Sequence, residues 1–155
     1  MCFIKLDMEF IEVADASQSL ICAGIYVRFK RTCGTYSCEL VVGKSKIVPD
    51  GMSVPRGELY GGEINSVLGG VVMRAFQDNV ITKRYKITDS KVALHWINSW
   101  DKPLKLWTRN RVNEILRWSD TDMWFWCPSS SMPCDIGTRR NATIDDIGEW
   151  TKGLE

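Results

Sequence analysis

Hydrophobic and β-forming residues alternate with polar ones through the first third of the chain, a pattern that predicts consecutive β-strands. Residues 8–14 and 21–30 show it, and residues 37–47 show it again after a turn signal at Gly34. The short connections between these segments favour an antiparallel meander. Prolines and a glycine between residues 49 and 55 then end the pattern.

Apolar residues recur at helical spacing after Pro55, and this spacing predicts a long helix that continues to Phe76. Proline is favourable in the first turn of a helix. The segment also contains several glycines, each of which costs about 1 kcal/mol relative to alanine in a helix interior. We therefore expect close packing against the sheet to stabilise this helix.

The second half of the chain alternates between shorter segments of the two types. We expect strands at 84–88 and 123–127, helices at 92–97 and 104–118, and a last helical turn that starts near Pro133. A run of strands followed by such alternation predicts an α/β fold, with helices on the faces of a mixed sheet. The 155 residues contain no repeat or internal linker, so we expect one domain.

The composition is that of an ordinary soluble protein, with 45% hydrophobic and 25% charged residues. No apolar run approaches the roughly 20 residues of a membrane span, and residues 1–14 lack the features of a signal peptide. We therefore expect no membrane association and no secretion. The six cysteines are expected to be reduced thiols, because neither their spacing nor the single histidine, His95, fits a zinc site.

The formal net charge of +1 does not by itself indicate a nucleic-acid-binding protein. Basic residues nevertheless outnumber acidic ones between residues 101 and 118. Such a local excess is typical of a solvated helix face, and a phosphate-contacting face is the alternative. The tryptophans between residues 96 and 126 could stack on nucleic-acid bases, although we expect most of them to belong to the core.

Four carboxylates fall at the ends of predicted elements. Asp15 ends the first strand, Glu58 lies in the first turn of the long helix, Asp89 ends the fourth strand, and Asp135 opens the last helix. If the first and fourth strands are neighbours, Asp15 and Asp89 lie side by side at one edge of the sheet, where α/β proteins commonly bind ligands.

Carboxylates held close together repel one another unless a cation lies between them, and Mg²⁺ is the natural occupant of such a site. Two such ions about 4 Å apart can support phosphodiester cleavage. The alternative is structural, because an aspartate after a strand often forms a turn, and Asp89 or Asp135 could cap a helix.

Seven short motifs, in the same order, resemble those of the ribonuclease H domain of BEL/Pao-type retrotransposon polyproteins. The resemblance extends from about residue 8 to residue 150. The motifs are Asp15-Ala16-Ser17; Gly24, Tyr26 and Arg28; Lys44-Ser45-Lys46 with Pro49; Pro55-Arg56-Gly57-Glu58-Leu59; Thr88-Asp89-Ser90-Lys91 through Trp96; Asn110-Arg111-Val112 with Glu114-Ile115; and Pro133-Cys134-Asp135-Ile136-Gly137-Thr138-Arg139.

The resemblance implies a ribonuclease H-like fold, with a mixed five-stranded sheet flanked by helices. It also implies a two-metal-ion ribonuclease H that uses Mg²⁺, with Mn²⁺ as a substitute, to hydrolyse the RNA strand of RNA–DNA hybrids during reverse transcription. Asp15 would then bridge both ions, Glu58 and Asp89 would share the first site, and Asp135 would complete the second.

Further residues are candidates for contacts with the hybrid. They are Ser17, Lys44, Arg56, Ser90, Asn110 and Arg111. Recognition of a hybrid through its shape and 2′-hydroxyls requires only a local positive face, so the low net charge is compatible with it. One departure from the family is that the loop at residues 128–132 contains no histidine. The missing loop histidine and the glycine-rich helix are compatible with a low rate of catalysis. For His95 we expect a packing or surface role.

Three functional hypotheses follow. The first is an active ribonuclease H, and the second is a catalytically silent ribonuclease H-like connection or hybrid-binding module of the polyprotein. The third, a transposase or integrase, is disfavoured because in those enzymes the glutamate comes last. We expect residues 1–153 to be a polyprotein fragment followed by a cloning remnant, Leu154-Glu155. Its partners would be the reverse transcriptase and integrase regions, in cytoplasmic virus-like particles or in the nucleus.

Overall fold

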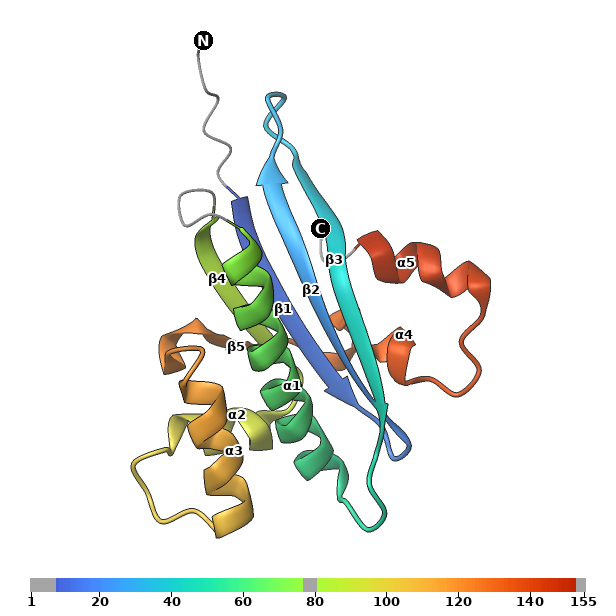
Figure 1. Ribbon diagram of the computed structural model, residues 1–155. Coiled ribbons are helices and arrows are strands. Elements are labelled where there is room, and N and C mark those ends of the chain that lie inside the picture. The colour runs from blue at the N-terminus through green and yellow to red at the C-terminus, as the bar shows by residue number, and fades with distance from the viewer. Residues whose placement is uncertain (1–7, 77–80, 153–155) are drawn as a thin grey trace.

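The computed structural model describes residues 8–76 and 81–152, and five strands in these ranges form one sheet (Figure 1). The strands are β1 (Met8–Ala16), β2 (Leu20–Lys30), β3 (Tyr36–Ile47), β4 (Ile81–Thr88) and β5 (Trp124–Trp126). Their order across the sheet is β3-β2-β1-β4-β5. The first three pair antiparallel, and β4 runs parallel to both β1 and β5. The predicted mixed five-stranded sheet with flanking helices is confirmed.

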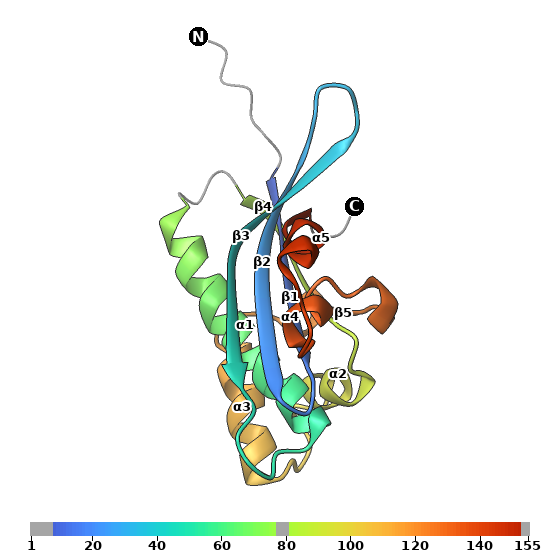
Figure 2. The same ribbon diagram turned by 90° about the vertical axis from the view of Figure 1, so that its right-hand side faces the viewer.

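Helices lie on both faces of the sheet, as the view along it shows (Figure 2). The long helix α1 (Val54–Ala75) covers one face, with α2 (Lys91–Asn98) and α3 (Leu106–Leu116) packed beside it. The short helices α4 (Asp135–Thr138) and α5 (Ile147–Lys152) lie against β2 and β3 on the opposite face. Short 3₁₀ turns at 121–123, 129–131 and 144–146 complete the described structure.

The glycines of α1 bring the helix close to the sheet, as the sequence predicts. A Cβ atom at Gly61 would lie 3.1 Å from Ile21 Cγ2, and one at Gly62 would lie 3.1 Å from a ring carbon of Trp124. At Gly70 a Cβ atom would overlap the Trp118 ring. The packing that these glycines permit offsets their low intrinsic helix propensity.

A buried ion-pair cluster, which the sequence pattern does not predict, links β1 to β4 on the face covered by α1. Glu12 and Lys86 are directly opposite each other in the parallel pairing of β1 and β4, and both side chains are fully inaccessible to solvent. The Lys86 ammonium contacts Glu12 Oε2 and donates to Ser66 Oγ at 3.3 Å. Arg84 Nε donates to Glu12 Oε1 at 2.8 Å. A buried carboxylate with two cationic partners avoids the cost of an unpaired charge.

Some element boundaries differ from the sequence expectations. Strand β4 begins at Ile81 rather than at residue 84, because its first residues pair with β1 although Thr82 and Lys83 are exposed and polar. Helix α3 begins at Leu106 rather than 104, and α5 has no counterpart among the predicted elements. Within the described ranges, no helix has the length and apolar character needed to cross a membrane.

Candidate metal centre

Three of the four predicted carboxylates converge at one end of the sheet. Asp15 lies near the end of β1, Asp89 follows β4 directly, and Glu58 is in the first turn and a half of α1. The parallel pairing places the carboxyl ends of β1 and β4 next to each other, and the start of α1 packs against the end of β1, where a Cβ atom at Gly57 would lie 3.1 Å from Ala16 Cβ. One carboxylate oxygen from each residue lies within 4.8 Å of the others.

Burial and mutual repulsion raise the pKa of two of these acids. Asp15 is only 6% exposed, and its burial raises its pKa above the usual value. A hydrogen bond from Thr138 opposes that rise, while the charges of Asp89 and Asp135 add to it. For Glu58, burial is also the largest cause and the neighbouring aspartates add to it, so that its pKa reaches about 7 despite a hydrogen bond with Ser90.

The oxygen donors of this cluster fit a divalent cation. Asp89 Oδ2 accepts a hydrogen bond from Ser129 Oγ at 2.6 Å, whereas Asp89 Oδ1 is buried and has no hydrogen-bond partner in the described part of the chain. A buried carboxylate oxygen without a partner is costly unless a cation coordinates it. Three hard oxygen ligands at this spacing match the preference of Mg²⁺ or Mn²⁺.

Asp135 is not a member of the converging group. It opens α4 on the other face of the sheet, and its Oδ2 accepts a hydrogen bond from Arg139 Nε at 2.9 Å, one helical turn away. Its side chain is 39% exposed. Its charge nevertheless contributes to the raised pKa of Asp15, so it lies close enough to act electrostatically on the cluster.

Two of the predicted substrate-contacting residues have local structural roles. Ser17 Oγ accepts the backbone N–H of Leu20 at 3.1 Å and shapes the turn between β1 and β2. Ser90 is buried and caps α2, because its Oγ accepts the backbone N–H of Ala93 at 3.1 Å. Its contact with Glu58 also connects this cap to the carboxylates.

The four other predicted substrate contacts are polar residues outside the cluster. Lys44 and Asn110 are exposed. The guanidinium of Arg111 is held over the Trp107 ring at 3.7 Å and pairs with Glu63 at 3.4 Å. Arg56 is exposed and lies two residues before Glu58.

A hollow of about 470 Å³ lies between the start of α1, helix α2 and the loop that leads into α3. It combines two cationic side chains with apolar walls. Its lining residues are Ser53, Pro55, Arg56, Val92, Trp96, Pro103, Leu104, Lys105 and Thr108. Arg56 is one of the substrate contacts predicted from the sequence, whereas Lys105 is not, although Lys105 belongs to the basic stretch between residues 101 and 118.

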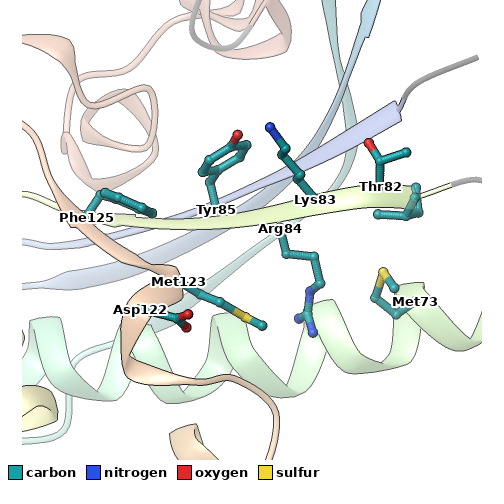
Figure 3. A pocket seen from close by; sticks show the side chains of 9 residues that line it. Met73, Thr82, Lys83, Arg84, Tyr85, Asp122, Met123 and Phe125 are labelled. Atoms are coloured by element: carbon teal, nitrogen blue, oxygen red, sulfur yellow. The ribbon is translucent and has the colours of Figure 1, made fainter.

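A second hollow lies at the opposite end of β4. Strand β5 pairs only with Lys86–Thr88, which leaves the edge of the first half of β4 without a strand neighbour on that side. Figure 3 shows this hollow, with Arg84 and Met123 on the side of α1 and Tyr85 and Thr82 on the other. It is therefore remote from the carboxylate end of β4.

The predicted base-stacking tryptophans divide between the core and the surface. Trp124 is buried, whereas Trp100 is 58% exposed and Trp126 is 45% exposed. The Trp126 ring lies next to the carboxylates, because its Nε1 donates to the backbone oxygen of Asp89 at 2.9 Å. His95 is exposed on α2. Trp96, Trp107 and Trp118 are partly buried, and the first two pack against the core cluster that contains Trp124. Most of these tryptophans therefore belong to the core, as expected.

Two further hydroxyls of the site were missed by sequence reasoning. Ser129 contacts Asp89, and Thr138 Oγ1 donates to Asp15 Oδ2 at 2.7 Å. The only sequence signal was their position near Asp135, with Thr138 inside the motif at 133–139 and Ser129 in the loop just before it.

Comparison with known proteins identifies the family. The sequence model described as the Pao retrotransposon-like RNaseH-like domain matches residues 4–90, more than half of the chain. This range includes Asp15, Glu58 and Asp89. No curated protein matches the sequence.

One solved structure shows the same fold. The N-terminal RNase H domain of Rv2228c from Mycobacterium tuberculosis, determined as a fusion with maltose-binding protein, is similar with a TM-score of 0.53 and 8% identity. That match covers 92% of this chain and 97% of the other. The protease–reverse transcriptase of prototype foamy virus has a TM-score of 0.42 and 12% identity, and the match covers 94% of this chain but 19% of the viral one. The chain belongs to the Pao retrotransposon-like family of ribonuclease H-like domains.

Proposed function

We propose that this domain is a metal-dependent ribonuclease H, which hydrolyses the RNA strand of RNA–DNA hybrids. The observation that supports this proposal most directly is the convergence of Asp15, Glu58 and Asp89 within 4.8 Å. A cluster of three carboxylates that includes a buried aspartate is unfavourable without a cation, and no lysine or arginine pairs with these three side chains within the described residues.

The residues have distinct roles in this proposal. Asp15, Glu58 and Asp89 would hold a divalent cation, and Asp135 would contribute to a second cation site after releasing Arg139. When bound, the cations supply an activated water and stabilise the charge on the leaving oxygen. The raised pKa of Glu58 reflects a site that favours neutralisation of its negative charge.

The hollow between α1, α2 and the loop that leads into α3 is suited to a nucleic-acid backbone. Arg56 and Lys105 line it and would contact phosphates, while the Trp96 side chain supplies an apolar wall for a sugar. Because a hybrid is recognised mainly by shape, phosphates and 2′-hydroxyls, these few cations suffice despite the formal net charge of +1.

The direct test is incubation of an end-labelled RNA–DNA hybrid with the protein and Mg²⁺ or Mn²⁺. We expect cleavage of the RNA strand only, in the hybrid but not in RNA or DNA duplexes of the same sequence, and none in excess chelator. Absence of metal-dependent cleavage at high protein concentration would contradict the proposal. The ion pair between Asp135 and Arg139 would then support the alternative, a catalytically silent hybrid-binding module.

Replacement of Arg56 is expected to weaken hybrid binding without impairing the chemical step. In Arg56→Ala, KM should rise several-fold with kcat nearly unchanged. The slope of log affinity against log salt concentration should fall in magnitude by about one, the contribution of one phosphate contact. Arg117→Ala is the matched control, because Arg117 is exposed and does not line the hollow. An unchanged KM and salt dependence in Arg56→Ala would remove Arg56 from the binding surface.

We also propose that the domain acts within a retrotransposon polyprotein, next to its reverse transcriptase and integrase regions. We place the domain in a cytoplasmic virus-like particle, where reverse transcription would produce the RNA–DNA hybrid that it cleaves. Family membership supports this context.

A further inference from the structure

Two hydroxyl side chains from one C-terminal segment contact two of the three clustered carboxylates. Thr138 Oγ1 donates to Asp15 Oδ2 at 2.7 Å, and Ser129 Oγ donates to Asp89 Oδ2 at 2.6 Å. These contacts connect residues that are 123 and 40 positions apart in the sequence. The segment 129–138 therefore reaches the ends of both β1 and β4.

The contacts leave a different oxygen of Asp89 for coordination. With Oδ2 engaged by Ser129, the other oxygen, Oδ1, is buried and has no hydrogen-bond partner among residues 8–76 and 81–152. A hydroxyl that donates to one carboxylate oxygen fixes the rotation of the group and so determines which oxygen faces the other acids. Asp15, also buried, is fixed in the same way by Thr138.

The segment is anchored firmly enough to fix these orientations. Met132 and Cys134 are buried in the core between β1, β2 and the C-terminal helices, and Cys134 Sγ contacts the backbone oxygen of Val13 at 3.7 Å. A Cβ atom at Gly137 would overlap the Cys22 sulfur, so α4 lies directly against β2. Thr138 is itself only 4% exposed.

The hydroxyl of Thr138 has two acceptors within reach but only one hydrogen. Besides Asp15 Oδ2, it lies 3.0 Å from the backbone oxygen of Asp135, within its own helical turn. The bond to a charged carboxylate is the stronger of the two. The hydrogen is therefore directed at Asp15. Stabilisation of the helical turn, through the backbone oxygen of Asp135, does not by itself account for the position of the Thr138 hydroxyl.

We propose that Thr138 and Ser129 are positioning residues that orient Asp15 and Asp89 for cation binding. This inference rests on the proposed function, since it assumes that the carboxylates hold a cation. Thr138 acts from a buried position, whereas Ser129 is exposed and competes with water for its bond. The larger effect is therefore assigned to Thr138.

The experiment measures cation affinity directly, without nucleic acid. Mn²⁺ binding to the full 155-residue chain is followed by electron paramagnetic resonance of the free ion, and Mg²⁺ binding by calorimetry. In Thr138→Val, which keeps the shape but removes the donor, we expect affinity to fall about 10- to 100-fold. In Thr138→Ser, which restores a hydroxyl, affinity should return to within a few-fold of wild type.

Ser129→Ala should weaken cation binding by a few-fold, and Ser130→Ala is its matched control. Ser130 is the exposed neighbour of Ser129 and should bind cations like wild type when replaced. The unfolding temperature in chelator is measured for each variant. If Thr138→Val proves unfolded, Ser129→Ala still decides the question, because an exposed serine is not needed for folding.

The outcomes separate this inference from the proposed function. If the wild-type chain binds neither cation, the proposed function fails. If wild type binds cation, Asp89→Asn removes that binding, and both Thr138→Val and Ser129→Ala bind as tightly as wild type, the positioning role alone is overturned. Loss of affinity that Thr138→Ser fails to restore would also overturn it, because the hydroxyl would then not be the cause.

Discussion

Asp89→Asn is expected to reduce cleavage of an RNA–DNA hybrid by roughly 10³-fold or more while making the cation-free protein more stable. The loss follows because the variant lacks one of the three converging carboxylates. Removal of several kcal/mol of cation-dependent transition-state stabilisation corresponds to a change of about this size. The measurement is single-turnover cleavage at saturating Mg²⁺.

The gain in stability has a separate cause. The charge of Asp89 raises the pKa of both Asp15 and Glu58, which means that the three carboxylates repel one another when no cation is bound. The amide of the variant is neutral and isosteric, and its oxygen can still accept the hydrogen bond from Ser129. We expect a gain of about 0.5–2 kcal/mol in chelator, the size typical of a single stabilising substitution.

Asp120→Asn is the control for both measurements. Asp120 is exposed and its side chain caps no helix, so its replacement should change neither cleavage nor stability. Cleavage by Asp89→Asn at the wild-type rate would exclude Asp89 from the site. A loss of cleavage without a gain in cation-free stability would show that the repulsion among the acids is negligible.

Lys86→Met should lower the free energy of unfolding by about 3–5 kcal/mol, because it removes one partner from a buried ion pair. Lys86 and Glu12 are both inaccessible to solvent, and desolvation lowers the pKa of the lysine. The variant leaves the Glu12 carboxylate buried with Arg84 as its remaining ionic partner. Urea unfolding followed by circular dichroism measures the change.

The matched control is Lys83→Met, an exposed lysine on the same strand. Its replacement should alter stability by no more than about 0.5 kcal/mol. A variant that replaces the whole cluster, Glu12→Leu with Arg84→Met and Lys86→Met, should recover much of the loss, because apolar side chains of similar volume commonly replace buried ion-pair clusters without cost. A loss below about 1 kcal/mol in Lys86→Met would contradict the role assigned to this cluster.

Much of the fold could be predicted from the sequence, because the three long strands and α1 have clear hydrophobic periods. The start of β4 was missed since Thr82 and Lys83 are polar and exposed, and only pairing with β1 defines them as strand residues. The buried pair of Glu12 and Lys86 was invisible for a related reason. Two charged residues in separate strands show no local signal that they face each other beneath a helix.

The site could be predicted only in part. Asp15, Glu58 and Asp89 were found because each lies at the end of a recognisable element, and the topology brings those ends together. The partners of these acids could not be found, because Ser129 and Thr138 reach them across long stretches of chain. The pairing of Asp135 with Arg139 was accessible in principle, since the two residues are one helical turn apart.

The contacts of the segment 129–138 have a consequence for when the site forms during synthesis. The three clustered acids are all present once the chain has been made as far as residue 89, but the hydroxyls that orient two of them come from residues 129 and 138. Domains generally fold as units as the chain emerges. A nascent or truncated chain that ends before this segment would therefore contain the acids in an unoriented state, and a cation would meet a finished site only when the domain was complete.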